Sequence, residues 1–134
     1  AKKLIERASR TAPDNALIQA NCIRRRADLS LRSGDPITAI KLASEAEHEY
    51  SSRGLLAASA RCRRLCGDAE AIQGAYKDAM SHFRRAIQQH LHGGDRRGAE
   101  RTVKHITGLL RSQGYEDPAK MIESIMNGSS GGGA

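Results

Sequence analysis

Residues 34–39 read GDPITA, residues 74–79 read GAYKDA and residues 114–119 read GYEDPA. Each stretch begins with glycine and ends with alanine, and successive copies lie forty residues apart. Self-similarity at a period of about 20 to 50 residues is typical of solenoids, whose units bury their apolar faces against neighbouring units. The repeat therefore predicts a stack of similar structural units.

The composition favours helices. The chain of 134 residues has no tryptophan and only 3% aromatic residues, so Ala, Leu, Ile, Val and Met must fill its interior. Such small residues suit closely approaching helices better than a β-sandwich. No apolar run approaches the roughly 18 residues that a membrane-spanning helix needs, so we expect no membrane association.

The cysteine count bears on the compartment. Three cysteines form an odd set, and no hydrophobic leader is present in the sequence. These features argue against a disulfide framework and favour a reducing environment. We therefore expect a cytoplasmic protein.

Glycines and capping residues divide the chain into segments with helical spacing of apolar residues. The pattern predicts one helix that ends before Gly34, one over about 36–50, one over about 55–73, one over about 76–92, one between Asp95 and Gly114, and a short one after Pro118. The expected apolar stripes are Ile37, Ile40, Ala43 and Ala46 on the second helix, and Leu55, Ala58, Cys62, Leu65, Ala69 and Ile72 on the third. At the start, Ala1, Ile5 and Ala8 predict a separate helix that ends near Pro13.

These helix pairs resemble the tetratricopeptide repeat, whose second helix carries small, large and small residues at spacings of four and three. Ala79, Phe83 and Ala86 match that pattern. Two further sets match with other central residues: Ala39, Ala43 and Ala46, and Ala1, Ile5 and Ala8. The family's small first-helix residue corresponds to Ala27, Gly67 and Thr107. The forty-residue unit is similar to a longer variant found in signalling adaptors and in sensor regions of bacterial regulators.

The resemblance implies an all-α fold, an α-solenoid of antiparallel helix hairpins in a right-handed superhelix. It covers residues 1–126, as a partial N-terminal helix followed by units over about 15–50, 55–92 and 95–126, and residues 127–134 are expected to form a flexible Gly/Ser tail. In the second unit the family register would turn Arg63 and Glu70 inward. Because an unpaired buried charge is costly, we expect the apolar stripe to be buried instead.

The net charge of +7, much of it in arginine doublets, is explained either by a solvated helix face or by an anionic partner, an acidic protein or a phosphate backbone. In the tetratricopeptide family the first helices line a concave groove, and the resemblance implies that the groove cations contact the partner. These are Arg24, Arg61, Arg64, Arg101, Lys104 and Arg111. The expected ligand is an acidic or amphipathic peptide segment, because arginine grips a carboxylate with two parallel donors. In the alternative interpretation these cations only pair within their own helices, as Arg24 with Asp28 and Arg64 with Asp68.

Other functions find less support in the sequence. Cys62 and Cys66 are one helical turn apart, but nothing completes a four-ligand metal set, and no nucleophile motif or phosphate-binding glycine loop is present. We expect a non-enzymatic protein without a cofactor or metal. Nucleic acid remains the rival partner because the isoelectric point is near 9.8. Self-association through exposed solenoid ends is a further possibility.

Overall fold

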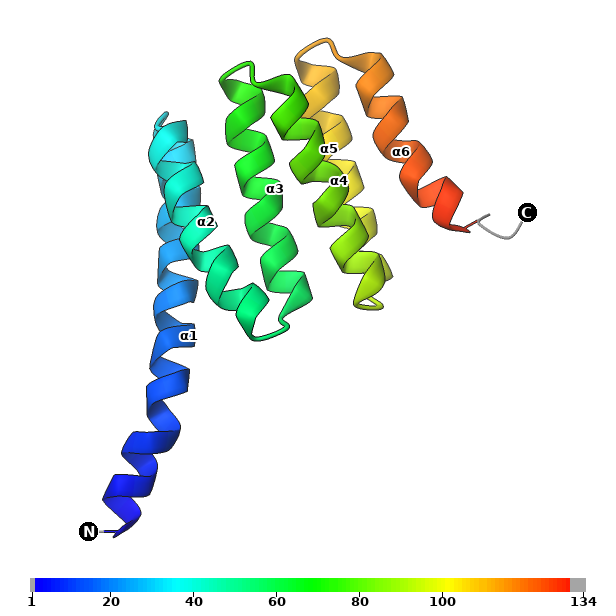
Figure 1. Cartoon of the computed structure of the whole chain (residues 1–134). Helices are drawn as coiled ribbons and strands as arrows, with labels where there is room; N and C mark the ends of the chain where they lie inside the picture. The colour runs from blue at the N-terminus through cyan, green and yellow to red at the C-terminus, as the bar shows by residue number, and fades with distance from the viewer. Residues whose placement is uncertain (1, 131–134) are drawn as a thin grey trace.

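The computed structural model describes residues 2–130, with side chains described for residues 15–127. The described residues form helices and no strand: α1 (Lys2–Arg32), α2 (Pro36–Ser52), α3 (Leu56–Ile72), α4 (Tyr76–His92), α5 (Arg96–Ser112) and α6 (Glu116–Ser130). Each helix packs against the next, and the chain reverses direction at every turn (Figure 1). In addition, α3 contacts both α1 and α5. The prediction of an all-α stack of helix hairpins is therefore confirmed.

The turns repeat at half the period seen in the sequence. Gly34, Gly54, Gly74, Gly94 and Gly114 all have positive φ, between 71° and 87°, and each lies twenty residues from the last. After each of them the chain closes with a bond from a backbone N–H to a carbonyl five residues earlier, as from Asp95 to His90 at 2.8 Å. This is the Schellman closure, which favours glycine because other residues rarely adopt positive φ. The same closure thus connects every helix to the next.

Small residues allow the helices to approach closely. Ala39, Ala79 and Ala119, the last residues of the three repeated stretches, are fully buried. At Gly67 on α3 an added Cβ would lie 2.5 Å from a ring carbon of Phe83 on α4. The positions that the tetratricopeptide pattern assigns to small residues are therefore contact points between helices.

The core consists of two apolar clusters. One contains residues of α1, α2 and α3 around Tyr50 and Leu65, and the other contains residues of α3, α4, α5 and α6 around Phe83 and Ile106. A polar network lies where α2, α3 and α4 meet: Ser59 donates to Glu47 at 2.9 Å and accepts from Gln89 at 3.1 Å. Helix α3 contributes to both clusters and to this network, so it is the central element of the stack.

The apolar stripe of α3 is buried at its centre, as predicted, since Cys62, Leu65 and Ala69 are shielded from solvent. Residues at the ends of the predicted stripes of α2 and α3 are not buried. Ile72 is 53% exposed, and Ile37 on α2 is 71% exposed, because residues in terminal turns have fewer neighbouring helices to cover them. Arg63 and Glu70 are half-buried, so they are not fully excluded from the interior as expected. Arg63 pairs with Glu47, and Glu70 contacts His82.

Two predictions about the chain ends are wrong. Helix α1 runs without interruption from Lys2 to Arg32, so no separate helix ends near Pro13, although the side chains of Ala1, Ile5 and Ala8 lie outside the described residues. The five turns all contain a positive-φ glycine, and the segment around Pro13 has none to reverse the chain.

At the other end, α6 continues to Ser130. Residues 127–130, predicted to belong to a flexible tail, are therefore helical. Extending a formed helix requires no new nucleus, so a few weak helix formers can be added at its end. Residues 131–134 lie outside the described residues.

Candidate functional site

A pocket rich in arginine lies along the first helices of the hairpins. Its volume is about 350 Å³. The residues that line it come from α1, α3, α5 and the end of α4: Arg24, Asp28, Arg32, Arg61, Arg64, Leu65, His90, Gly98, Arg101 and Thr102. We call it the basic pocket. Because α1, α3 and α5 run in the same direction, residues forty apart on these helices come to similar heights and meet there.

The structure brings four of the six predicted site residues into the basic pocket. Arg24 comes from α1, Arg61 and Arg64 from α3, and Arg101 from α5. Arg61 and Arg101 occupy equivalent places in the forty-residue repeat, as do Arg24 and Arg64. The repeat therefore concentrates guanidinium groups in one hollow.

Some of the pocket arginines have carboxylate partners. Arg32 pairs with Asp28 at 3.1 Å, whereas the alternative interpretation paired Asp28 with Arg24. An acid placed four residues before its base is the more favourable order on a helix, which explains the choice of Arg32. The other predicted pair is present, because Arg64 Nε lies 3.8 Å from Asp68 Oδ2.

Asp68 is the buried acid beside the basic pocket. Its side chain is only 7% exposed, and its Oδ2 lies 2.8 Å from His105 Nε2 on α5. Its Oδ1 has no hydrogen-bond partner, and neither has the buried Nε of Arg64. At 3.8 Å the contact between Arg64 and Asp68 is electrostatic and too long for a hydrogen bond. Asp68 therefore balances charge at Arg64 and links α3 to α5.

The remaining pocket arginines lack such partners. Among the described residues, no carboxylate lies within ion-pair distance of Arg24, Arg61 or Arg101. Arg61 and Arg101 are exposed and Arg24 is half-buried. The pKa of neighbouring His90 is lowered mainly by burial, and the charges of Arg61 and Arg101 act in the same direction. These three guanidinium groups are open to an anionic ligand.

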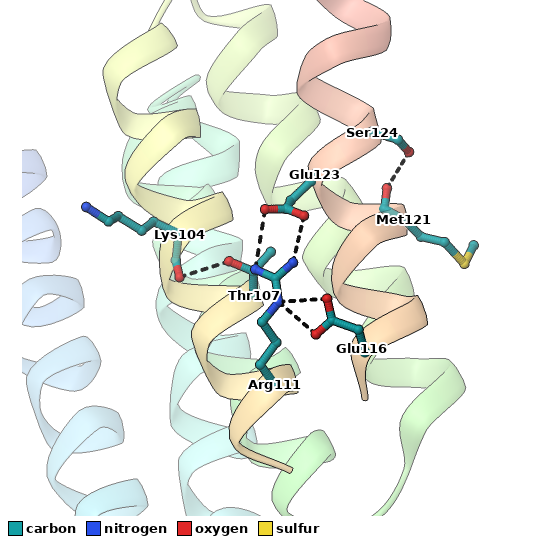
Figure 2. Close-up of polar contacts among 7 residues, drawn as sticks. All are labelled: Lys104, Thr107, Arg111, Glu116, Met121, Glu123 and Ser124. Carbon is teal, nitrogen blue, oxygen red and sulfur yellow. Dashed lines mark hydrogen bonds and ion pairs between the residues drawn. The ribbon is translucent and has the colours of Figure 1, made fainter. Parts of the chain in front are cut away.

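Two predicted site residues lie outside the basic pocket. Lys104 is an exposed residue of α5, and its side chain points away from the contacts between α5 and α6 (Figure 2). Arg111 is held by two glutamates of α6: its Nε donates to Glu116 at 2.9 Å and its Nη2 donates to Glu123 at 2.8 Å (Figure 2). These hydrogen bonds raise the pKa of Arg111. Arg111 therefore closes the last hairpin.

His90 is a pocket residue that the sequence analysis did not find. It is 3% exposed, and its Nδ1 lies 3.1 Å from Asp95 Oδ2. Asp95 also caps α5 by accepting from the Gly98 N–H at 2.9 Å. Burial lowers the pKa of His90, although Asp95 acts in the opposite direction. The signal in the sequence was a capping aspartate placed five residues after a histidine, with a glycine turn between them.

A second hollow, with a volume of about 510 Å³, adjoins the basic pocket. Its apolar wall includes Leu17, Leu55, Leu56 and Ala58, and it also contains Tyr50, whose hydroxyl donates to Asn21 Oδ1 at 2.5 Å. We call it the apolar pocket. Arg61 and His90 line both hollows. The surface thus offers a cationic place beside an apolar one.

Two of the three cysteines have the character of core residues, whereas Cys22 is exposed. Cys62 and Cys66 are buried, and desolvation raises the pKa of their thiols to about 12 and about 11. Such thiols remain protonated and unreactive at neutral pH. Within the part of the chain that the structure describes, no three His, Cys, Asp or Glu residues gather in a way that could hold a metal ion.

Comparison with protein-family models found no match to this chain, and comparisons with curated proteins and with solved structures found no significant match. None of the described helices is both long enough and apolar enough to cross a bilayer. The site must therefore be interpreted from its own geometry.

Proposed function

We propose that this chain is a protein-interaction module of the tetratricopeptide type, which binds an acidic or amphipathic segment of another polypeptide. One observation carries the proposal: Arg24, Arg61 and Arg101, from three successive first helices, line one pocket without carboxylate partners among the described residues. The cost of bringing like charges together is recovered when an anion binds between them.

The adjoining apolar pocket supports an amphipathic ligand. An extended or helical segment that places an acid in the basic pocket can place an apolar side chain beside Leu17 and Leu56. Apolar contact provides buried area, and the arginines fix the orientation of the segment. The scaffold itself performs no chemistry in this proposal.

Nucleic acid is the less favoured partner. Binding of single strands generally relies on exposed aromatic rings that stack on bases. Here Phe83 and Tyr50 are buried, and the rings of Tyr76 and Tyr115 lie against each other, with centroids 5.2 Å apart. None of these rings except that of Tyr50 lines either hollow of the candidate site.

Selection from a random peptide display library tests the proposal. Peptides enriched on the wild-type protein are expected to contain acidic and apolar residues. Their affinity, measured by fluorescence anisotropy at physiological salt, should fall by about tenfold for each of Arg24, Arg61 and Arg101 that is replaced by alanine, since hydrogen bonds to charged groups contribute about 1.5–3 kcal/mol each. Replacing Arg64, whose charge Asp68 already balances, should lower it by less.

The matched control removes the same charge elsewhere. Arg25, Arg26, Arg84 and Arg85 are exposed and line neither hollow of the candidate site. Replacing these four by alanine should leave peptide affinity nearly unchanged. Equal losses in both variants would mean that overall charge, and not the basic pocket, attracts the peptide. Tight oligonucleotide binding at physiological salt would favour the rival function.

A further inference from the structure

The number and placement of the free arginines indicate the charge of the ligand. Arg24 on α1, Arg61 on α3 and Arg101 on α5 each bring a guanidinium group to the basic pocket. The pocket's own acid, Asp28, is already paired with Arg32. Nearby Asp68 is occupied by His105 and Arg64. Asp95 lies near Arg101 but is already engaged by His90 and the Gly98 N–H. Three positive charges in one hollow thus remain without a described carboxylate within ion-pair distance.

A single carboxylate does not satisfy this arrangement. It carries one negative charge and two oxygens, so it can receive the paired donors of one guanidinium group fully. A phosphoryl monoester carries three terminal oxygens and a charge of about −2 near neutral pH. Three arginines arriving from three helices can each contact a different face of such a group, which makes it the better match in charge and in shape.

We propose that the basic pocket recognises a phosphorylated side chain of the partner polypeptide, with a large apolar residue nearby in the partner's sequence that enters the apolar pocket. The inference rests on the proposed function, since it concerns the same groove. The apolar requirement follows from the shared wall of the two hollows, where Arg61 and His90 line both. The phosphorylated and apolar residues must therefore be close together in the partner.

His90 has a defined role at this shared wall. Asp95 Oδ2 can only accept, so the Nδ1 of His90 carries the proton of their hydrogen bond. In the neutral ring Nε2 is then an acceptor. A buried neutral ring adds no cationic donor at the shared wall, so recognition of the phosphoryl group falls to the arginines.

Three degenerate peptide libraries test the inference by fluorescence anisotropy at physiological salt. They share random flanks and differ at the centre, which is phosphoserine, serine or a Glu-Glu pair. The phosphoserine library should bind about tenfold or more tightly than either of the others, because charged hydrogen bonds to two or more arginines are gained. Equal or tighter binding of the Glu-Glu library would overturn the inference.

The arginines provide the second arm of the experiment. Replacing Arg24, Arg61 and Arg101 by alanine should abolish the preference for phosphoserine, whereas the control replacement of Arg25, Arg26 and Arg84 should preserve it. Circular dichroism establishes that each variant is folded. If the triple variant does not fold, the exposed single change Arg101→Gln provides the same measurement, with a loss of preference expected. An unchanged preference in folded variants would refute the assignment.

Sequencing the bound phosphopeptides tests the apolar pocket. Leu, Ile, Met or Phe should be enriched at a fixed distance from the phosphoserine, and Leu55→Ser should remove the enrichment; Leu55 is 39% exposed, so the change should not unfold the protein. Absence of any apolar enrichment would refute the paired recognition. Arginine-dependent binding of the Glu-Glu library alone would overturn this inference and leave the proposed function intact, and failure of every library would overturn both. Tighter binding of oligonucleotides than of the phosphopeptides would overturn the inference and indicate that the ligand is a nucleic acid.

Discussion

The basic pocket and the α5–α6 hairpin use arginine in opposite ways. Arg101 and Arg111 lie on the same helix, yet Arg101 has no carboxylate partner among the described residues while Arg111 holds two glutamates of α6. The difference comes from the neighbouring helices: α6 supplies Glu116 and Glu123, whereas no described carboxylate lies within ion-pair distance of Arg101, and nearby Asp95 is engaged by His90 and the Gly98 N–H. An arginine is available to a ligand only where the fold leaves it without a partner.

The two regions also differ in what holds their helices together. Around the pocket, α3 and α4 meet through a steric fit between Gly67 and Phe83, and Asp68 is buried between α3 and α5. At the end of the stack, the additional contacts of Arg111 are exposed to solvent. We therefore expect changes near α3 to affect stability strongly and changes in the terminal ion pairs to affect it weakly.

The largest effect is expected for Gly67→Ala. The added methyl group would lie 2.5 Å from the ring of Phe83, which is fully buried and cannot move aside. Overpacking of this kind costs about 1–3 kcal/mol, which exceeds the gain of up to about 1 kcal/mol in helix propensity. Thermal unfolding followed by circular dichroism should show a fall of several degrees in Tm.

Gly108→Ala is the control for that change. Gly108 is also a helical glycine, on α5, but beyond the neighbouring backbone of its own helix nothing lies within 4 Å of the added Cβ. Its replacement should raise stability by about 0.5–1 kcal/mol through helix propensity alone. If both variants were stabilised, the close contact between α3 and α4 would not be a determinant of the fold.

The next effect is expected for Asp68→Ala, which removes the buried acid beside the pocket. Arg64 would lose its counter-charge and His105 its acceptor; because both of these side chains are partly exposed, solvent offsets part of the loss, and the cost should be about 1 kcal/mol. Because Arg64 also lines the basic pocket, its release should strengthen anion binding. Chemical denaturation should therefore show a lower free energy of unfolding, and fluorescence anisotropy should show a higher affinity for an acidic peptide.

Asp28→Ala separates the effect on affinity from the effect on stability, because Asp28 is more exposed than Asp68, with 38% of its side chain accessible. Its removal frees Arg32, so affinity for an anion should rise with little loss of stability. A large loss of stability here, or no gain in affinity from either variant, would contradict the difference drawn between the two acids.

Much of this arrangement could be predicted from the sequence. The positions of Arg24, Arg61, Arg64 and Arg101 in a forty-residue repeat placed them on parallel helices, and the structure brings them into one pocket. The role of Arg111 could not be predicted, because it depends on how α6 directs Glu123 across the hairpin. His90 was missed for a similar reason, since its burial and its contact with Asp95 arise from tertiary packing and not from periodicity.

A smaller effect concerns the pH dependence of stability. Burial lowers the pKa of His90 from its usual value of 6.5 in the folded state. The unfolded chain therefore binds more protons below pH 6.5, so stability is fully present above that value and is lost as the pH falls through the lowered pKa. Asp95, whose pKa is lowered from 3.8, contributes in the same direction only at more acidic pH.

Denaturation of His90→Gln between neutral and mildly acidic pH tests this assignment. The variant should show a flatter dependence of unfolding free energy on pH than the wild type, whatever its absolute stability. His92→Gln, which replaces an exposed histidine two residues away, should retain the wild-type slope. Parallel slopes in the wild type and in His90→Gln would exclude His90 as the titrating group.

The smallest effect is expected for Arg111→Ala, at the end of the stack. Both glutamate contacts are exposed, so solvent and salt screen them, and the fall in Tm should be slight and should disappear at high salt. Glu123→Gln should produce a similar small change. The double variant should lose less stability than the sum of the two single losses, because both changes remove one shared contact. Affinity for peptide should not change, since Arg111 lies outside the basic pocket. A marked loss of peptide affinity in Arg111→Ala would show that the ligand extends to α6 and displaces the glutamates, which would remove the distinction between arginines that hold the fold and arginines that bind the partner.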